Sequence, residues 1–539
     1  MLGWGWNQLI LISSLFYLNF VMEFQIIPGK NKKYFILIKN IQTKEEFEMY
    51  DTIKDTLSRK EYKPFIQSLN KTIEYSYLFR DYLFPIQFWE DIKNKLIELY
   101  NYCPILNGYE QLLNINITEN SFNQFINKLK VPDKIKIDDE KYKYQQECAY
   151  LALLNKIGRI EIGTSGGKTF ITYMYCRYIY ENYQYFIDDN TFEERPERKQ
   201  ILIIVPSKLL AKQLIDDFTE YQEFEKHKMI IETIYAGSKR IANADIVCGT
   251  YQSLCNYDKE YFDDFGYIIC DEVHRAKAYS IKSEIYDKIT NAEFFFGMSG
   301  TYPKYKSLDY LHIVSMFGSL LYRKPVKSLI DDGISTPVKI HIIKIKYLKD
   351  NDFSKNLKAN GITGSEKYRI EKEFFQNYTE RTNIICKLLK HYKSNALILV
   401  DTVDYCTILA DYISEYFSNL DIKKDIRIIH GEVNDREQII QDMKNTNSDF
   451  ILIGTYGTMS TGVSIPTIEQ LYFVDGGKSD TRIRQSIGRG IRLSPNKEYC
   501  DVFDFYDDIP YSSFKNHANE RMSIFREQNL DFKITNVSI

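Results

Sequence analysis

The stretch that decides the fold is Arg159-Ile-Glu-Ile-Gly-Thr-Ser-Gly-Gly-Lys-Thr169, with Phe170-Ile-Thr-Tyr-Met-Tyr-Cys-Arg177 directly after it. A strand-like segment, a glycine-rich turn and a helical segment follow one another here. Glycines let backbone N–H groups face a phosphate, and the start of the helix adds the positive end of its dipole. The stretch therefore predicts a phosphate-binding loop, formed by Gly163, Thr164, Ser165, Gly166, Gly167, Lys168 and Thr169.

The last two residues of this loop carry its chemistry. We expect Lys168 to contact the β- and γ-phosphates of ATP and the Thr169 hydroxyl to hold Mg²⁺. The full G-x-x-x-x-G-K pattern is not met, because Ile162 occupies the position of its first glycine. The alternative is a glycine-rich turn with a solvated lysine, and the flanking strand and helix argue against it.

Short apolar runs alternate with helical patterns over most of the chain. Such runs between helices indicate parallel strands that are covered on both faces, and two consecutive α/β domains follow from them. The runs lie at residues 159–162, 201–205, 246–248, 267–270 and 294–296, and after an extended stretch at 338–345 they resume at 396–400, 426–429, 450–453 and 471–474. We place the first domain at residues 133–340, the second at 341–510 and a helical tail at 511–539.

Residues 22–132 contain no nucleotide motif. A strand pattern at 34–39 and helical spacing at 88–100 predict a small α+β accessory domain. Residues 1–21 are uncharged and mostly apolar, which leaves three interpretations. The length suits a membrane anchor, whereas a secretory signal would need a basic start and a small-residue cleavage site. We favour the third, in which translation begins at Met22, because a nucleotide-binding chain needs cytoplasmic ATP.

Composition limits the class of protein. The 539 residues are 44% hydrophobic and 27% charged, which is typical of a folded globular chain. The net charge is −3, so a nucleic-acid groove would have to be a local basic strip. Nine scattered cysteines without a C-x-x-C pair indicate reduced core thiols rather than disulfides or a zinc site.

An acidic motif, Asp271-Glu-Val-His274, follows the apolar run at 267–270. A carboxylate at the C-terminal end of a buried parallel strand lies in the ligand crevice of the sheet. We expect Asp271 to hold Mg²⁺ and Glu272 to orient or deprotonate the attacking water. Acidic pairs at strand ends are often merely solvated, but the position downstream of a phosphate loop favours the catalytic role. His274 fits a structural role equally well.

The most specific signal in the second domain is Gln485-Ser-Ile-Gly-Arg-Gly-Ile-Arg492. If the segment is helical, Gln485, Arg489 and Arg492 fall on one face. Two guanidinium groups there suit the charge that develops on a γ-phosphate held by the other domain. Such an arginine finger contributes a rate factor on the order of 10³ or more. The alternative is the solvated start of a basic helix.

This ordered set of motifs resembles the superfamily 2 helicases, and among them the UvsW-type helicases of T-even bacteriophages. The resemblance covers roughly residues 140–510 and rests on runs such as Ile203-Ile-Val-Pro-Ser207, Cys248-Gly-Thr-Tyr-Gln252, Met298-Ser-Gly-Thr301 and Thr455-Tyr-Gly-Thr-Met-Ser-Thr-Gly-Val-Ser464. It implies two tandem RecA-like parallel-sheet domains, and before them a small α+β domain at 22–132 whose expected role is nucleic-acid binding. It also implies ATP-driven unwinding of branched DNA and removal of R-loops in phage recombination, repair and replication.

Further residues acquire roles through the resemblance. It implies that Ser299 and Thr301 couple the acidic motif to nucleic acid, and that Gln145 reads adenine, with Gln146 as a rival. Loops at the same sheet edges would hold the phosphates of nucleic acid through backbone N–H and hydroxyl groups, without reading sequence. The candidates are Pro206, Ser207, Lys208, Thr250, Gln252, Gly431, Thr455 and Thr461.

The expected partner is DNA, as branched, single-stranded or R-loop substrates, with RNA as a further candidate. We expect a cytoplasmic protein, in the host cell if a phage encodes it, without stable membrane association. One alternative is the double-strand translocase of a restriction or repair complex, which predicts a nuclease partner or domain. Another is a DNA-binding or annealing protein gated by ATP. The intact set of Lys168, Asp271, Glu272 and the two arginines argues against that one.

Overall fold

The computed structural model describes most of the chain beyond residue 21. The described residues are 22–29, 33–62, 72–79, 82–109, 117–187, 192–234, 243–274, 278–303, 305, 307–392, 394–433, 435–445, 449–459, 465–475, 477, 483, 486–488, 492–494 and 497–539. The segment 1–21, with its competing interpretations, lies outside them. Within these ranges, no helix is both long and apolar enough to cross a membrane.

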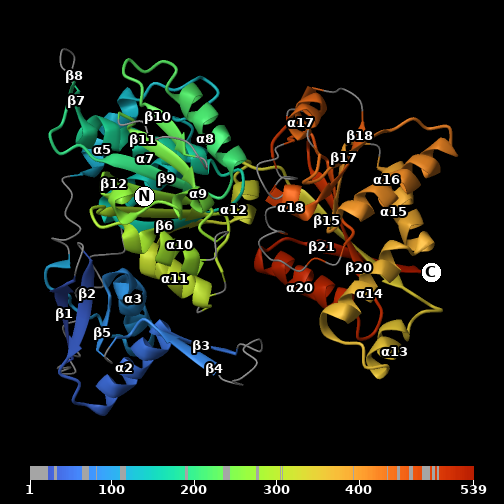
Figure 1. The fold of residues 1–539 in the computed structure, drawn as a ribbon, viewed down its shortest axis with the longest axis horizontal. Helices are drawn as coiled ribbons and strands as arrows, with labels where there is room; N and C mark the ends of the chain where they lie inside the picture. The colour runs from blue at the N-terminus through green and yellow to red at the C-terminus, as the bar shows by residue number, and fades with distance from the viewer. Residues whose placement is uncertain are drawn as a thin grey trace.

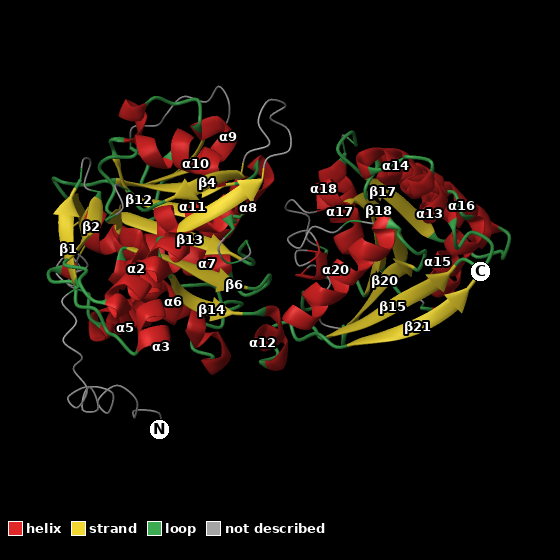
Figure 2. Ribbon diagram, turned by 90° about the horizontal axis from the view of Figure 1, so that it is seen from below, coloured by secondary structure: helices red, strands yellow, loops and turns green. Residues whose placement is uncertain are grey.

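Two α/β bodies lie side by side, and a smaller body packs against the first of them (Figure 1). The helix α12 (Val326–Asp331) lies between the two larger bodies in both views (Figure 2). Val326 packs in the core of the second body, while Leu329 packs in the core of the first. This short helix therefore connects the hydrophobic cores of both.

The N-terminal body has the expected α+β composition. The predicted strand at 34–39 is present, and the predicted helix begins at Trp89 after a short 3₁₀ turn. Thr43 caps α2 in a reciprocal pair with Glu46, which fixes where that helix starts. The elements are an antiparallel sheet of β1 (Glu23–Pro28), β2 (Tyr34–Lys39) and β5 (Leu83–Pro85), the hairpin β3 (Ser58–Tyr62) and β4 (Thr72–Ser76), and the helices α2 (Lys44–Leu57) and α3 (Trp89–Tyr100).

The first α/β domain is built on a seven-stranded parallel sheet in the order β10-β11-β9-β12-β13-β6-β14. Its five predicted strands are present. The two outer strands went unpredicted because they are short and only partly apolar. The strands are β6 (Ile157–Ile162), β9 (Gln200–Val205), β10 (Ile231–Ile234), β11 (Ile246–Thr250), β12 (Phe265–Asp271), β13 (Phe294–Ser299) and β14 (Leu320–Lys324).

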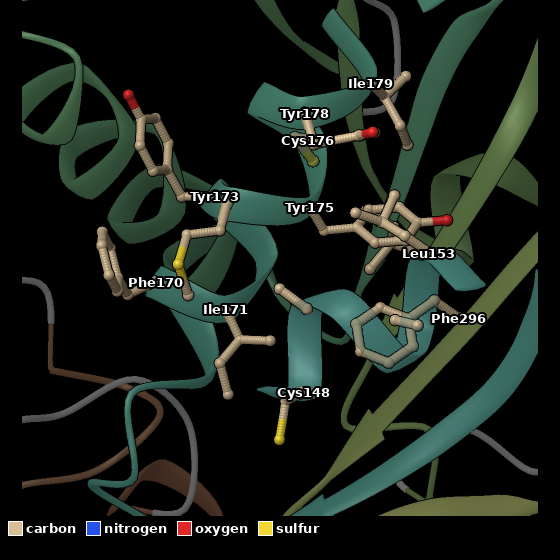
Figure 3. Close-up of a cluster of buried hydrophobic side chains, with 14 of the residues drawn as sticks. Cys148, Leu153, Phe170, Ile171, Tyr173, Tyr175, Cys176, Tyr178, Ile179 and Phe296 are labelled. Atoms are coloured by element: carbon tan, nitrogen blue, oxygen red, sulfur yellow. The ribbon is translucent and has the colours of Figure 1, made fainter. Parts of the chain in front are cut away.

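Helices cover both faces of this sheet and enclose two hydrophobic cores. The helix α7 is buried at every residue from Phe170 to Ile179, which explains its apolar character all round (Figure 3). The helices are α5 (Glu119–Lys128), α6 (Lys143–Asn155), α7 (Lys168–Ile179), α8 (Lys208–Tyr221), α9 (Tyr251–Leu254), α10 (Ala278–Glu284) and α11 (Leu308–Phe317), and a small hairpin joins β7 (Tyr185–Ile187) to β8 (Phe192–Glu194).

The second α/β domain has a parallel seven-stranded sheet in the order β17-β18-β16-β19-β20-β15-β21. Its strands are β15 (Val338–Lys346), β16 (Ala396–Val400), β17 (Asp425–Ile429), β18 (Phe450–Thr455), β19 (Gln470–Phe473), β20 (Cys500–Asp507) and β21 (Phe532–Ser538). Its helices are α13 (Phe353–Ala359), α14 (Gly364–Gln376), α15 (Thr379–His391), α16 (Val403–Ser418), α17 (Arg436–Asn445), α18 (Tyr456–Met459) and α20 (Ser513–Glu527).

Two boundaries differ from those expected. The sheet of the second domain already begins at Val338, within the range assigned to the first. The segment 511–539 is not a helical tail alone, because β21 follows α20 and pairs in parallel with β15. The side chains of β21 are mostly exposed, so this strand lacks the apolar run by which the other strands were predicted.

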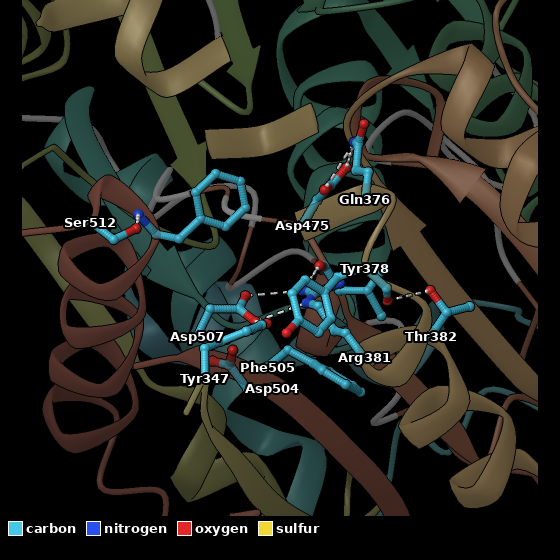
Figure 4. A network of polar contacts seen from close by, with 12 residues as sticks. Tyr347, Gln376, Tyr378, Arg381, Thr382, Asp475, Asp504, Phe505, Asp507 and Ser512 are labelled. Carbon is cyan, nitrogen blue, oxygen red and sulfur yellow. Dashed lines mark hydrogen bonds and ion pairs between the residues drawn. The ribbon is translucent and has the colours of Figure 1, made fainter. Parts of the chain in front are cut away.

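The strand β20 went unpredicted for a different reason, which is the charge of its sequence, Cys-Asp-Val-Phe-Asp-Phe-Tyr-Asp. Arg381 binds Asp507 at 2.8 and 3.0 Å (Figure 4). Arg521 binds Asp504 at 2.7 Å, and all four side chains are about 1% exposed. Buried charges are tolerated only when they are paired and hydrogen-bonded. The aspartates therefore fix α15 and α20 on the sheet.

The cysteines agree with the expectation from their spacing. All nine are free thiols, and seven of them are buried. Burial raises the pKa of thiols such as Cys248, to about 12. They act as small apolar core residues.

Gly297 allows a test of how tightly the first sheet is packed. A Cβ at this position would lie 2.9 Å from Cγ of Phe317, which is 1% exposed. We expect Gly297→Ala to lower stability by about 1–3 kcal/mol through overpacking. Urea and thermal unfolding measure the change. Gly457→Ala is the control, since no atom lies within 4 Å of its Cβ position. Equal shifts for both variants would contradict tight packing at Gly297.

Candidate active site

The phosphate loop has the conformation that its sequence predicts. The chain leaves β6 at Ile162, and α7 begins at Lys168. Ser165 and Gly167 have positive φ angles of 71° and 78°, and the Gly166 amide donates to the Gly163 carbonyl at 3.0 Å. The two positive φ angles and this hydrogen bond form a tight turn at the N-terminus of α7, where an anion is favoured.

Ile162 shows why the departure from the glycine pattern is tolerated. The residue is fully buried, and a Cβ on Gly166 would lie 2.4 Å from its Cγ2 atom. The isoleucine side chain thus packs beneath the loop, and the glycine that the loop requires is Gly166 instead.

Lys168 and Glu272 face one another across the site. Lys168 Nζ lies 3.4 Å from Oε1 of Glu272 and 3.4 Å from the Ile162 carbonyl oxygen. Glu272 has a φ of 51°. This left-handed backbone conformation is energetically unfavourable for residues other than glycine, and it occurs often at functional sites. Asp271, the last residue of β12, accepts a hydrogen bond from the Glu272 amide at 2.9 Å. The loop lysine and both carboxylates therefore meet at one edge of the sheet.

His274 bridges two motifs. Its Nδ1 atom lies 2.5 Å from the Ser299 hydroxyl and 3.4 Å from the Glu272 carboxylate. Ser299 is fully buried at the end of β13, and its hydroxyl accepts from the Thr301 amide at 3.0 Å. The sequence left His274 between a catalytic and a structural role. The structure places it as a hydrogen-bonded link between the acidic motif and the predicted coupling residues.

The two candidate glutamines take different positions. The Gln145 side chain donates to the Gly166 carbonyl at 3.2 Å, while that of Gln146 donates to the Ile137 carbonyl at 2.7 Å. Tyr144 also donates to Gly166, at 2.6 Å. Gln145 therefore lies against the phosphate loop, and its reading of adenine stays a prediction. The contact from Tyr144 was not predicted, because a tyrosine at the start of a helix has no distinctive pattern.

The second domain reaches the phosphate loop through Gly488. A Cβ at Gly488 would lie 2.3 Å from the Cβ of Thr164. Only a glycine leaves room here for the Thr164 side chain. Gln485 and Arg489, from the same motif, lie outside the described residues. Residues 486–488 are helical, but Arg492 is not, so the expected single helical face does not extend to it. Pro495, three residues further on, disfavours continuation of a helix.

Arg492 nevertheless faces the first domain. Burial lowers its pKa, and the Asp217 carboxylate on α8 opposes that change. Burial raises the pKa of Asp217 to about 6, while Lys134 and Arg492 act to lower it. The Arg492 carbonyl accepts from the Thr336 hydroxyl at 3.0 Å, which fixes its backbone. A guanidinium of the second domain is thus held at the boundary with the first.

The residues predicted to contact nucleic acid follow other strands than the residues of the predicted ATP site. Pro206, Ser207 and Lys208 follow β9, and Thr250 ends β11 with an exposed Gln252 after it. In the second sheet, an exposed Gly431 follows β17, and Thr455 ends β18; Thr461 lies outside the described residues. In the first sheet β9 and β11 are neighbours on the β10 side of β12, and in the second sheet β17 and β18 are neighbours at one edge.

Comparison with known proteins agrees with this arrangement. The family model for the Type III restriction enzyme res subunit matches residues 120–304, and the model for the helicase conserved C-terminal domain matches residues 380–494. The first match contains every strand of the first sheet except β14, and the second contains β16 to β19 of the second sheet. The chain belongs to the superfamily 2 helicases.

Individual members of this superfamily resemble the chain to different extents. The ATP-dependent DNA helicase UvsW of Enterobacteria phage T4 is 28% identical over 411 residues, which is 75% of this chain and 74% of that protein. A fragment of a putative HsdR subunit of a type I restriction enzyme from Vibrio vulnificus covers 90% of this chain and 92% of that one, with a TM-score of 0.54 and 16% identity. The type ISP restriction-modification enzyme LlaBIII bound to DNA has a TM-score of 0.55 and 15% identity, over 76% of this helicase and 32% of that chain. These two structures share the fold.

The contact between Gly488 and Thr164 yields a prediction for this helicase. Gly488→Ala would push the second domain away from the phosphate loop, and a misplacement of about 1 Å can cost 10²-fold in rate. We expect the rate constant of ATP hydrolysis to fall by about that factor, with ATP binding largely retained. Single-turnover hydrolysis and fluorescent-nucleotide binding measure the two quantities.

A compensating substitution is the control for this effect. Thr164→Gly removes the atoms that the new methyl group would meet. The Gly488→Ala/Thr164→Gly double variant should hydrolyse ATP faster than Gly488→Ala alone. If Gly488→Ala hydrolyses ATP like the wild type, the two domains do not have to meet at this point.

Proposed function

We propose that this chain is an ATP-dependent helicase and translocase that remodels branched DNA or R-loops. The single observation that carries the proposal is the junction of Gly488 with Thr164, where a motif of the second domain meets the phosphate loop of the first. An ATP site shared by two domains changes their relative position each time ATP is bound and hydrolysed. That is the property a nucleic-acid motor needs.

The residues at the site fit ATP with Mg²⁺. The Asp271 carboxylate and the Thr169 hydroxyl are hard oxygen donors at adjacent ends of β12 and α7, which suit this cation. When bound, Mg²⁺ would neutralise charge on the phosphates. Lys168, which now lies beside Glu272, would turn to the phosphates. Glu272 would then be released to orient the attacking water.

The second domain supplies the opposite half of the site. Arg492 is partly buried at the domain boundary, and its positive charge faces the first domain. We propose that Arg492 and Arg489 stabilise the charge that develops on the γ-phosphate. After hydrolysis this attraction weakens, so the domains can separate.

Nucleic acid would lie across both sheets, beside ATP. The candidate loops after β9 and β11 and those after β17 and β18 lie on corresponding sides of the two sheets. One strand held at both places would be moved when the domains close. Ser207 caps α8, and its neighbouring backbone N–H groups suit a phosphate contact. Such contacts grip the backbone irrespective of base sequence.

The substrate class comes from the relatives. The phage T4 protein is named a DNA helicase, and the LlaBIII structure contains DNA. We propose that the substrate is branched DNA or an R-loop, as part of phage recombination, repair and replication in the host cytoplasm. The accessory domain at 22–132 would hold the duplex part of such a substrate.

Hydrolysis in the presence of DNA tests this function. We expect ATPase activity that DNA stimulates, and a loss of about 10²-fold or more in Glu272→Gln, because the attacking water is no longer activated. Lys168→Ala should lose activity through weaker phosphate binding. Glu366→Gln, at an exposed position on α14, is the matched control and should hydrolyse ATP like the wild type. Normal hydrolysis by a pure Glu272→Gln preparation would refute the mechanism.

A panel of substrates then separates the helicase from the alternatives. Forks, four-way junctions and R-loops are incubated with ATP, and the released strands are measured. Unwinding of these structures supports the proposal. Displacement of a triplex-forming third strand from linear duplex, without separation of the two duplex strands, would instead indicate a double-strand translocase.

A further inference from the structure

Arg159 is an unusual residue for an inner strand of a parallel sheet. It lies in β6, directly upstream of the phosphate loop, and is only 2% exposed. Arginine is rarely buried to this degree unless its charge is compensated. The groups that compensate it are therefore informative about its role.

Two tyrosines enclose the guanidinium. Its carbon atom lies 5.0 Å from the ring centre of Tyr302 and 4.7 Å from that of Tyr310, both within the range of cation–π attraction. Arg159 also donates to the Tyr310 hydroxyl at 2.8 Å. The rings leave the guanidinium little freedom to turn.

The negative charge that faces Arg159 comes from another domain. Asp91, on α3 of the N-terminal domain, lies 3.9 Å from the Arg159 guanidinium and accepts from the Tyr310 hydroxyl at 3.4 Å. The N-terminal domain is docked here through its core, which includes Leu311 and Val314 of α11. Displacement of the N-terminal domain would thus remove the carboxylate from a buried cation.

Tyr302 connects the same cation to the catalytic motifs. It directly follows Thr301, and its hydroxyl donates to the Ile160 carbonyl of β6 at 2.9 Å. Thr301 in turn binds Ser299, which binds His274 beside Glu272. A continuous series of contacts therefore runs from Asp91 to the catalytic carboxylate.

We propose that Arg159, held by Asp91, is a positioning residue through which the N-terminal domain sets the conformation of the Ser299–Tyr302 segment and thereby the rate of ATP hydrolysis. The proposal rests on the function proposed above. DNA that engages the N-terminal domain would shift Asp91 relative to Arg159. Because arginine remains charged, the cation would draw the tyrosines with it.

The test is DNA-stimulated hydrolysis by the full chain carrying Asp91→Asn. We expect hydrolysis without DNA and the affinity for a DNA fork to stay close to those of the wild type. The rate at saturating fork DNA should fall by about fivefold or more, the usual size of coupling between sites. Asp51→Asn, at an exposed position on α2 of the same domain, is the matched control and should behave like the wild type.

A second variant guards against a general loss of stability. Tyr310→Phe keeps the ring over Arg159 and removes only the hydroxyl that Arg159 and Asp91 share. It should lower the stimulated rate in the same way, and the double variant should lose less than the sum of the single losses.

The outcomes are distinct. No stimulation of the wild type by DNA would refute the proposed function itself. Stimulation of Asp91→Asn equal to that of Asp51→Asn would overturn this inference alone. If the hydrolysis rate of Asp91→Asn falls equally with and without DNA, Asp91 has a structural role and the inference is overturned. If the loss in rate vanishes at higher DNA concentration, Asp91 acts in DNA binding and the inference is overturned as well.

Discussion

The contact between Gly488 and Thr164 is the constraint on which the active site depends. Lys168, Asp271 and Glu272 all belong to one sheet, and their geometry would allow nucleotide binding by the first domain alone. The charge that develops during hydrolysis needs cations from the other side. A glycine at position 488 lets the second domain come close enough to provide them. We propose that ATP turnover and domain movement are coupled for this reason.

The sequence predicted the inner strands of the first sheet, and all those of the second except β20, because most buried parallel strands are continuously apolar. It predicted Lys168 and Glu272 at the ligand edge of one sheet, and their side chains lie 3.4 Å apart, while their roles toward phosphate and water stay predictions. β20 was hidden by its aspartates, whose partners Arg381 and Arg521 lie in helices distant in the sequence. β21 was hidden by its exposed side chains.

Other parts of the site depend on tertiary contacts that no local pattern encodes. The bond of His274 to Ser299 joins segments that are 25 residues apart, and the Tyr144 contact reaches 22 residues along the chain. The requirement for a glycine at 488 arises only when the two domains meet. The buried arginines also depend on tertiary contacts with residues distant in the sequence. Arg381 and Arg521 fix helices on the second sheet, whereas Arg159 lies where the N-terminal domain joins the first.

The central claim is that the ATP site is divided between two domains, and Arg492 tests it most directly. Single-turnover hydrolysis and equilibrium binding of ATP are to be measured for Arg492→Ala. The account predicts that the hydrolysis rate constant falls on the order of 10³-fold, while the ATP dissociation constant changes little. A variant that binds ATP poorly but hydrolyses bound ATP at the wild-type rate would contradict the division of the site.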